Sequence, residues 1–158
     1  MVDDERTGCA LPRGATGFLR PGDGALPDTD VRGFRTALYE AARVAGGRVG
    51  EVEERTYPLT FHTASVIDRA GEHVVLCHAH LPWVAFGRDR RNWYDEEFLD
   101  PPAWASAFTH VGFTVLDRER LATPLTDVDT SGFTRDEWRA VRLYRVTTLG
   151  GVLFNTWA

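Results

Sequence analysis

The sequence contains no lysine, and all 18 of its basic residues are arginines. Catalysis through a lysine Schiff base is therefore excluded, and so is a phosphate-binding P-loop, whose motif requires a lysine. Codon preference in a GC-rich genome explains such a bias, and we adopt this explanation. The alternative is selection for bidentate recognition of carboxylates or phosphates, which arginine provides and lysine does not.

Cysteine is also scarce, with only two in 158 residues. Cys9 lies in a stretch rich in glycine and proline, whereas Cys77 lies in an apolar run. Because a disulfide-stabilised scaffold needs more cysteines than this, Cys77 is predicted to be a small buried apolar residue. A reducing compartment, the cytoplasm, is the simplest location for such a chain.

Long apolar segments are missing as well. No run approaches the length that is needed to cross a bilayer. Residues 1–6 are mostly acidic and have no apolar core after them, so they do not have the pattern of a secretory signal. We therefore expect a soluble protein that has no membrane partner.

An excess of positive charge is absent too, because 23 acidic residues against 18 arginines give a net charge of −5. Proteins that bind phosphate backbones carry a basic surface, so no nucleic-acid partner is expected. Along the chain the acids gather in residues 51–54 and 95–100, and the arginines gather in residues 88–91 and 135–145. The junction of opposite charges near residue 91 suggests a local recognition loop.

What the sequence does contain is the composition of one ordinary globular domain, with 43% hydrophobic and 26% charged residues. Residues 1–29 hold many glycines and prolines and few aliphatic residues, so they are predicted to be an irregular or mobile lead-in. Residues 30–158 are predicted to form a single α+β domain.

The first half of this domain shows one helical pattern and then several β patterns. Apolar positions recur at helical spacing over residues 31–45, and Gly46 can end that helix. The pattern then predicts an edge strand over 49–57, a strand over 59–68 and a central strand over 73–86, kinked or ended near its proline. Because a short turn joins the last two, the sheet is expected to be antiparallel.

The second half shows helix signals. Asp-Pro-Pro is typical of a helix start, so residues 100–112 are predicted to be helical. Residues 134–137 form a capping box, and Phe133 and Trp138 occupy the two positions of a hydrophobic staple. The tail, residues 148–157, fits a helix or a strand. The predicted fold is thus α+β, with an N-terminal helix packed on an antiparallel sheet of three to five strands and short C-terminal helices.

Three histidines form the first candidate site. His78 and His80 are two residues apart and point to one face if they lie in a strand, and His62 joins them if the hairpin register allows. Imidazoles that converge from neighbouring strands can hold Zn²⁺ and leave a position for water. The alternative is that these histidines make ordinary hydrogen bonds, and no cofactor is then expected.

Two other motifs are incomplete. Residues 127–132 begin like a calcium-binding EF-hand loop, but the twelfth position is Trp138 instead of glutamate, which favours a plain Asx turn. Cys77 and His78 are adjacent, and adjacent side chains of a strand point to opposite faces, so they are not expected to form a catalytic dyad.

A second candidate site is the polar loop that follows residue 87. It combines arginines, aromatic residues and carboxylates, which is the composition of a protein-binding surface. A merely solvated loop and a catalytic pair of carboxylates are the alternatives. The predicted partner-binding residues are Arg90, Arg91, Trp93, Tyr94, Asp95, Glu96 and Glu97.

These observations favour a small acidic cytoplasmic domain that binds another protein, in the manner of an immunity-type or antitoxin-type inhibitor of a basic toxin. No complete catalytic motif is present, so an enzyme is not the preferred interpretation. Two alternatives remain open. One is a metal-dependent enzyme or metal-binding domain using the strand histidines, and the other is a small-molecule-binding accessory protein of a biosynthetic pathway.

Overall fold

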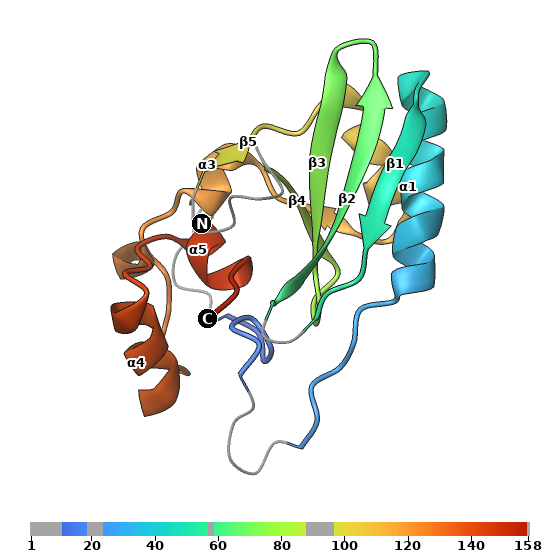
Figure 1. Ribbon diagram of the computed structural model, residues 1–158. Coiled ribbons are helices and arrows are strands. Elements are labelled where there is room, and N and C mark those ends of the chain that lie inside the picture. The colour runs from blue at the N-terminus through green and yellow to red at the C-terminus, as the bar shows by residue number, and fades with distance from the viewer. Residues whose placement is uncertain (1–10, 19–23, 57–58, 88–96, 158) are drawn as a thin grey trace.

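The structure is a computed structural model that describes residues 11–18, 24–56, 59–87 and 97–157 (Figure 1). After one N-terminal helix, the first half of the chain consists mainly of strands, and the second half consists mainly of short helices. The elements are α1 (Val31–Ala45), β1 (Arg48–Glu53), β2 (Phe61–Asp68), β3 (Gly71–His78), β4 (Trp83–Gly87), β5 (Phe98–Leu99), the 3-10 helix η2 (Ala103–Ala105), α2 (Ser106–Val111), β6 (Thr114–Val115), α3 (Arg118–Leu121), the 3-10 helix η3 (Leu125–Asp127), α4 (Arg135–Leu143) and α5 (Leu149–Leu153).

The predicted α+β class is confirmed, because α1 packs on a sheet that is mostly antiparallel and short helices follow it. Strands β1 to β5 lie side by side in sequence order, and each pairs with the next in antiparallel orientation. The prediction of at most five strands is corrected by β6, which pairs with β4 in parallel orientation. A parallel pair requires a crossover connection, and α2 supplies it.

Helix α1 forms where the apolar spacing predicts it. Phe34, Leu38 and Ala41 are fully buried against the sheet. Gly46 ends the helix in the left-handed conformation, with φ 72°, and its N–H bonds to carbonyls of the last turn. The predicted helix is confirmed at both ends.

The predicted central strand over residues 73–86 is wrong as one element, because the chain reverses after His78 and forms two antiparallel strands, β3 and β4. The apolar run is continuous because both strands are buried over most of their length. No glycine or asparagine marks the turn. Instead, the His78 ring accepts hydrogen bonds from the N–H groups of His80 and Leu81, at 3.0 and 3.2 Å.

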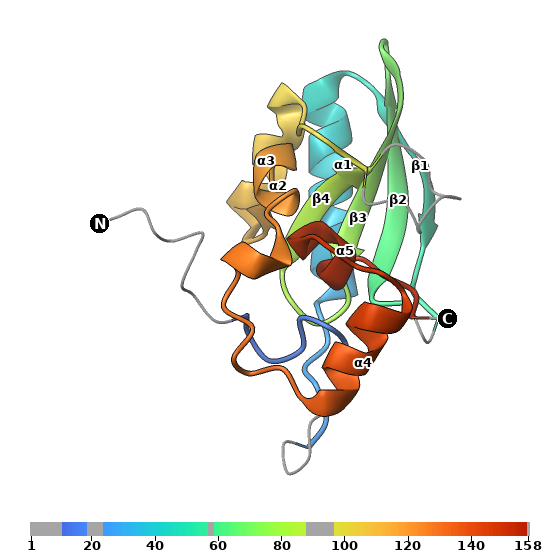
Figure 2. The same cartoon turned by 90° about the vertical axis from the view of Figure 1, so that its left-hand side faces the viewer.

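The sheet has a hydrophobic cluster on each face. One cluster lies under α1 and α2 and includes Phe34, Phe86 and Phe108. The other joins β3 and β4 to α3 and α5 and includes Leu121 and Leu153. Figure 1 shows α1 on one side of the molecule and α3, α4 and α5 on the other, and Figure 2 shows α5 above α4 next to the N-terminal segment.

The local signals of the C-terminal half are confirmed. Thr134 and Glu137 make both reciprocal bonds of the capping box at the start of α4. Phe133 and Trp138 contact each other with ring centroids 5.3 Å apart, as a hydrophobic staple does. The tail contains helix α5 and not a strand, with the Thr148 side chain as its N-cap.

The described part of the predicted lead-in has no helix or strand. It is nevertheless packed into the domain, since Ala15 and Thr16 are 0% and 1% exposed. Phe18 contacts Trp157 of the C-terminal tail, with ring centroids 5.5 Å apart.

None of the helices in the described ranges has both the length and the apolar character that crossing a membrane requires.

Phe108 should be essential for stability, because it is fully buried and its ring packs against those of Phe34 and Phe86. Phe108→Ala is expected to lower the free energy of unfolding by about 3–5 kcal/mol. Tyr39→Ala on α1, where the side chain is 63% exposed, is the control and should change it by less than about 0.5 kcal/mol. Urea unfolding measures both, and similar values for the two variants would contradict the described core.

Candidate functional site

The structure does not bring the three predicted zinc histidines together on one face. The β2–β3 register pairs His62 with Cys77 and Phe61 with His78. Directly paired residues share a face and successive residues alternate, so His62 and His78 lie on opposite faces of the sheet. His80 lies beyond β3, in the turn. The zinc hypothesis requires a register that places His62 on the same face as His78, and the observed register does not do so.

His78 is fully buried, and both of its ring nitrogens are engaged by backbone groups. Nδ1 accepts from the two N–H groups of the β3–β4 turn, so the proton must reside on Nε2. Nε2 donates to the carbonyl of Ala15, at 3.0 Å. Burial lowers the pKa of His78 to about 3, so the ring stays neutral at neutral pH.

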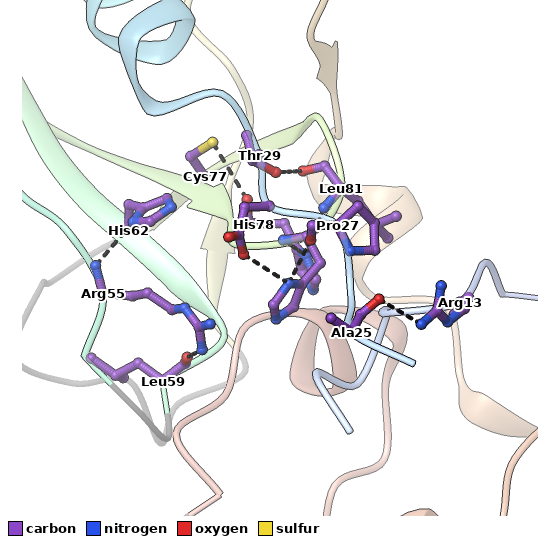
Figure 3. A network of polar contacts seen from close by, with 12 residues as sticks. Arg13, Ala25, Pro27, Thr29, Arg55, Leu59, His62, Cys77, His78 and Leu81 are labelled. Atoms are coloured by element: carbon purple, nitrogen blue, oxygen red, sulfur yellow. Dashed lines mark hydrogen bonds and ion pairs between the residues drawn. The ribbon is translucent and has the colours of Figure 1, made fainter. Parts of the chain in front are cut away.

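His80 and His62 also hold backbone segments, and Figure 3 shows His62 beside Arg55. His80 Nδ1 donates to the carbonyl of Pro27, at 2.8 Å, and thereby ties residues 24–29 to the end of β3. His62 Nδ1 accepts from the backbone N–H of Arg55, at 2.9 Å, and burial lowers the pKa of His62. Among the described residues, no group of three or more His, Cys, Asp or Glu side chains is placed to hold a metal ion. The zinc hypothesis gains no support from this geometry.

Cys77 is a free, fully buried thiol. Burial raises its pKa to about 12, so the thiolate that nucleophilic catalysis requires does not form at neutral pH. It packs in the cluster under α1, whereas the His78 ring contacts Phe154 on the other face. The expectation that these two residues do not form a dyad agrees with this arrangement.

A buried polar contact joins the N-terminal segment to α4 and to the C-terminal tail. The Thr16 hydroxyl donates to Glu137 Oε2, at 2.5 Å, and the Thr134 N–H donates to Glu137 Oε1, at 2.8 Å. Trp157 Nε1 donates to the carbonyl of Thr16, at 2.7 Å. The capping box had assigned Glu137 only a local role, and its long-range partner was missed.

A second buried contact joins the tail to β2. Thr60 donates its hydroxyl hydrogen to the carbonyl of Leu153, at 2.8 Å, and accepts from the N–H of Asn155, at 2.9 Å. The Asn155 amide then donates to the carbonyl of Gly151, at 2.7 Å. These buried side chains satisfy backbone groups, which is a structural role.

One cluster that the sequence reasoning missed lies at the tip of the β2–β3 hairpin. Asp68 Oδ1 lies 2.9 Å from His73 Nε2, and Trp104 Nε1 donates to Asp68 Oδ2, at 3.2 Å. The hydrogen bond from His73 lowers the pKa of Asp68 against the opposing effect of burial. The sequence did offer a signal for the Asp68–His73 pair. The two residues flank a two-residue turn at positions that are diagonal neighbours on adjacent strands.

A carboxylate that orients an imidazole is an arrangement found in general acid–base sites. Here, however, Trp104 occupies the second carboxylate oxygen of Asp68, and its ring also contacts the ring of His73, with centroids 5.3 Å apart. Among the described residues, these contacts tie the hairpin tip to η2. We interpret the cluster as a structural clamp.

The predicted partner-binding loop falls mostly outside the described residues, which exclude Arg90, Arg91, Trp93, Tyr94, Asp95 and Glu96. Glu97 is described and is exposed directly before β5. Near it, Asp100 accepts from the backbone N–H of Arg118, at 3.3 Å, which places the segments 97–100 and 117–119 side by side. Their exposed carboxylates form the β5–α3 acidic surface, defined as Glu97, Asp100, Asp117 and Glu119.

Aromatic side chains fill the interface between α1 and the sheet, which is where a pocket between helix and sheet would lie under the small-molecule hypothesis. Phe34 lies 6.3 Å from Phe108, and Phe86 lies 5.6 Å from Trp104 and 6.2 Å from Phe108, measured between ring centroids. All four rings are buried. This packing gives the small-molecule hypothesis no support.

Comparison of the chain with protein-family models, with curated proteins and with solved structures gave no match.

The neutral state of His78 predicts that acid begins to destabilise the fold at a pH above the range in which carboxylates titrate. Between pH values of about 6.5 and 3 the unfolded chain binds a proton at this histidine and the folded chain does not. The free energy of unfolding should therefore fall with decreasing pH, by about 1.4 kcal/mol per pH unit from this group alone.

Urea unfolding followed by tryptophan fluorescence at several pH values measures this slope. His78→Gln keeps an acceptor and a donor but does not ionise, so its slope should be smaller by that amount. His110→Gln, at an exposed position, is the matched control and should keep the wild-type slope. An unchanged slope in His78→Gln would show that the ring is not held neutral.

Proposed function

We propose that this chain is a protein-binding domain that recognises a basic partner protein through the β5–α3 acidic surface and the adjoining loop. Like an immunity-type or antitoxin-type inhibitor, it would act in the cytoplasm by covering a positively charged region of a toxin. The observation that carries the proposal is the convergence of exposed carboxylates from two segments, one of which directly follows that loop in the sequence.

The buried chemistry of the described residues supports a surface function indirectly. His62, His78, Thr16 and Glu137 all bind groups that hold chain segments in place. Cys77 is kept as a thiol by burial. The groups whose chemistry is most perturbed thus have structural roles, so the proposal rests on the exposed charged side chains instead.

Two carboxylates of the acidic surface are held in fixed orientations. Asp117 accepts from the N–H of Arg120, at 2.7 Å, as the N-cap of α3, and Asp100 accepts from the N–H of Arg118. Side chains that are already ordered lose less conformational entropy on binding, so they bind more effectively than mobile ones. This pre-organisation favours recognition over simple solvation.

Apolar and aromatic groups accompany these charges. Leu99 is 37% exposed between Glu97 and Asp100. The loop that precedes Glu97 carries Trp93 and Tyr94 in the sequence, and aromatic residues dominate the binding energy of protein interfaces. The carboxylates would speed association with a basic partner, and the apolar groups would supply most of the affinity.

The proposal is tested by affinity capture from the native host at low salt, with identification of the retained protein. We expect a basic protein to be retained stoichiometrically, and the triple variant Glu97→Gln/Asp100→Asn/Glu119→Gln to weaken its binding about tenfold. This magnitude follows from about 0.2–1 kcal/mol for each exposed ion pair and about 1.4 kcal/mol for each factor of ten.

The triple variant Glu72→Gln/Asp127→Asn/Asp136→Asn changes the net charge equally at exposed positions elsewhere. It should retain the partner with nearly wild-type affinity. Equal weakening by the two variants, or retention of a partner that is not basic, would contradict the proposal.

A further inference from the structure

Helix α4 carries a basic face that the proposed function does not use. Arg135, Arg139 and Arg142 follow one another at intervals of four and three residues and are all exposed. At about 100° per residue, this spacing places the three side chains within an arc of roughly 60°. The buried residues Glu137, Ala140 and Val141 lie on the opposite side of the helix.

Two apolar side chains flank the arginines. Trp138 is partly exposed on one side, with the Arg142 guanidinium 5.7 Å from its ring centroid. Leu143 is 68% exposed on the other side. Tryptophan and arginine are the residues most enriched at the energetic centres of protein interfaces. We call these five residues the α4 arginine face.

The arginines have no carboxylate partner in the structure, as far as the described residues extend. Asp136 is exposed on the same helix but forms no ion pair with them there. By contrast, two arginines near the N-terminal half of the chain, Arg35 and Arg43, do pair with Glu54 and Glu40.

Part of this arrangement opposes the stability of the helix itself. Arg135 is the first helical residue, where a positive charge is repelled by the helix dipole. Arg135 and Arg139 are four residues apart, a spacing at which like charges destabilise a helix. Arg135 and Arg139 therefore cost the helix stability, and none of the three arginines has a carboxylate partner among the described residues, as expected of a binding surface whose ligand is absent.

We propose that the α4 arginine face binds an acidic, amphipathic segment of a second protein. Arginine guanidinium groups bind carboxylates in a bidentate manner, so they would contact the acidic side chains of the segment. Trp138 and Leu143 would contact its apolar side chains. This site differs from the β5–α3 acidic surface and does not depend on it, because its partner has the opposite charge.

A protein segment fits this face better than a nucleic acid does. A phosphate backbone offers nothing for an exposed leucine to contact, and the net charge of −5 repels a long polyanion from most of the molecule. A short acidic segment meets only the local field of the three arginines, since charges beyond about 10 Å are screened by salt.

The test is a titration of the full chain with three synthetic probes. These are a helical peptide with glutamates and leucines on one face, a glutamate-only peptide of the same length, and a short DNA duplex. Calorimetry gives the affinities, and backbone amide chemical shifts locate the binding. We expect the amphipathic peptide to bind most tightly and to shift residues of α4.

The double variant Arg139→Gln/Arg142→Gln should weaken binding of the amphipathic peptide by at least about tenfold. The control is Arg32→Gln/Arg48→Gln, which makes the same change in net charge at exposed positions of α1 and β1 and should bind almost normally. Equal weakening by both pairs, tighter binding of the DNA or the glutamate-only peptide, or chemical-shift changes away from α4 would overturn the proposal.

Arg135→Glu separates binding from structure. It should weaken peptide binding and at the same time raise Tm by about 1–2 °C, because it removes repulsion in the first turn. A lowered Tm would mean that Arg135 stabilises the fold, and the case for a binding role of this face would then fail.

Discussion

The neutral imidazole of His78 joins the β3–β4 turn and the N-terminal segment to β3, and the packing of that segment on the sheet depends on it. Its Nδ1 holds the two N–H groups of the β3–β4 turn, and its Nε2 holds the carbonyl of Ala15. A protonated ring would lose both turn bonds, because Nδ1 could no longer accept. One uncharged side chain is thus required both for the β3–β4 turn and for the contact of the N-terminal segment with β3.

Further buried polar groups extend this arrangement to both ends of the described chain. Thr16 joins the N-terminal segment to Glu137 of α4 and to Trp157 of the tail, and Thr60 joins β2 to the same tail. Buried polar groups without partners are costly, so these contacts specify one way of assembling the segments. The buried polar groups thus hold chain segments in place, and the two surfaces that we propose for recognition, the β5–α3 acidic surface and the α4 arginine face, consist mainly of exposed side chains.

Local signals predicted most elements, and long-range pairing explains what they missed. The spacing of Phe34 and Leu38 identified α1, and the capping box identified the start of α4, because both depend on neighbours in the sequence. The β3–β4 turn was missed because a histidine ring closes it instead of a turn residue. The contact of Thr16 with Glu137, 121 residues apart, and the clamp of Asp68 on Trp104 have no local signature. For the same reason His78 was recognised as a notable residue while its ring partners were not.

The most direct test of this account is the ionisation and tautomer of His78, observed by ¹⁵N NMR of the imidazole ring. We expect a neutral ring with its proton on Nε2, and resonances that change little until the pH falls below about 5, because the pKa is lowered to about 3. A ring that titrates near its ordinary pKa of about 6.5, or that carries its proton on Nδ1, would contradict it.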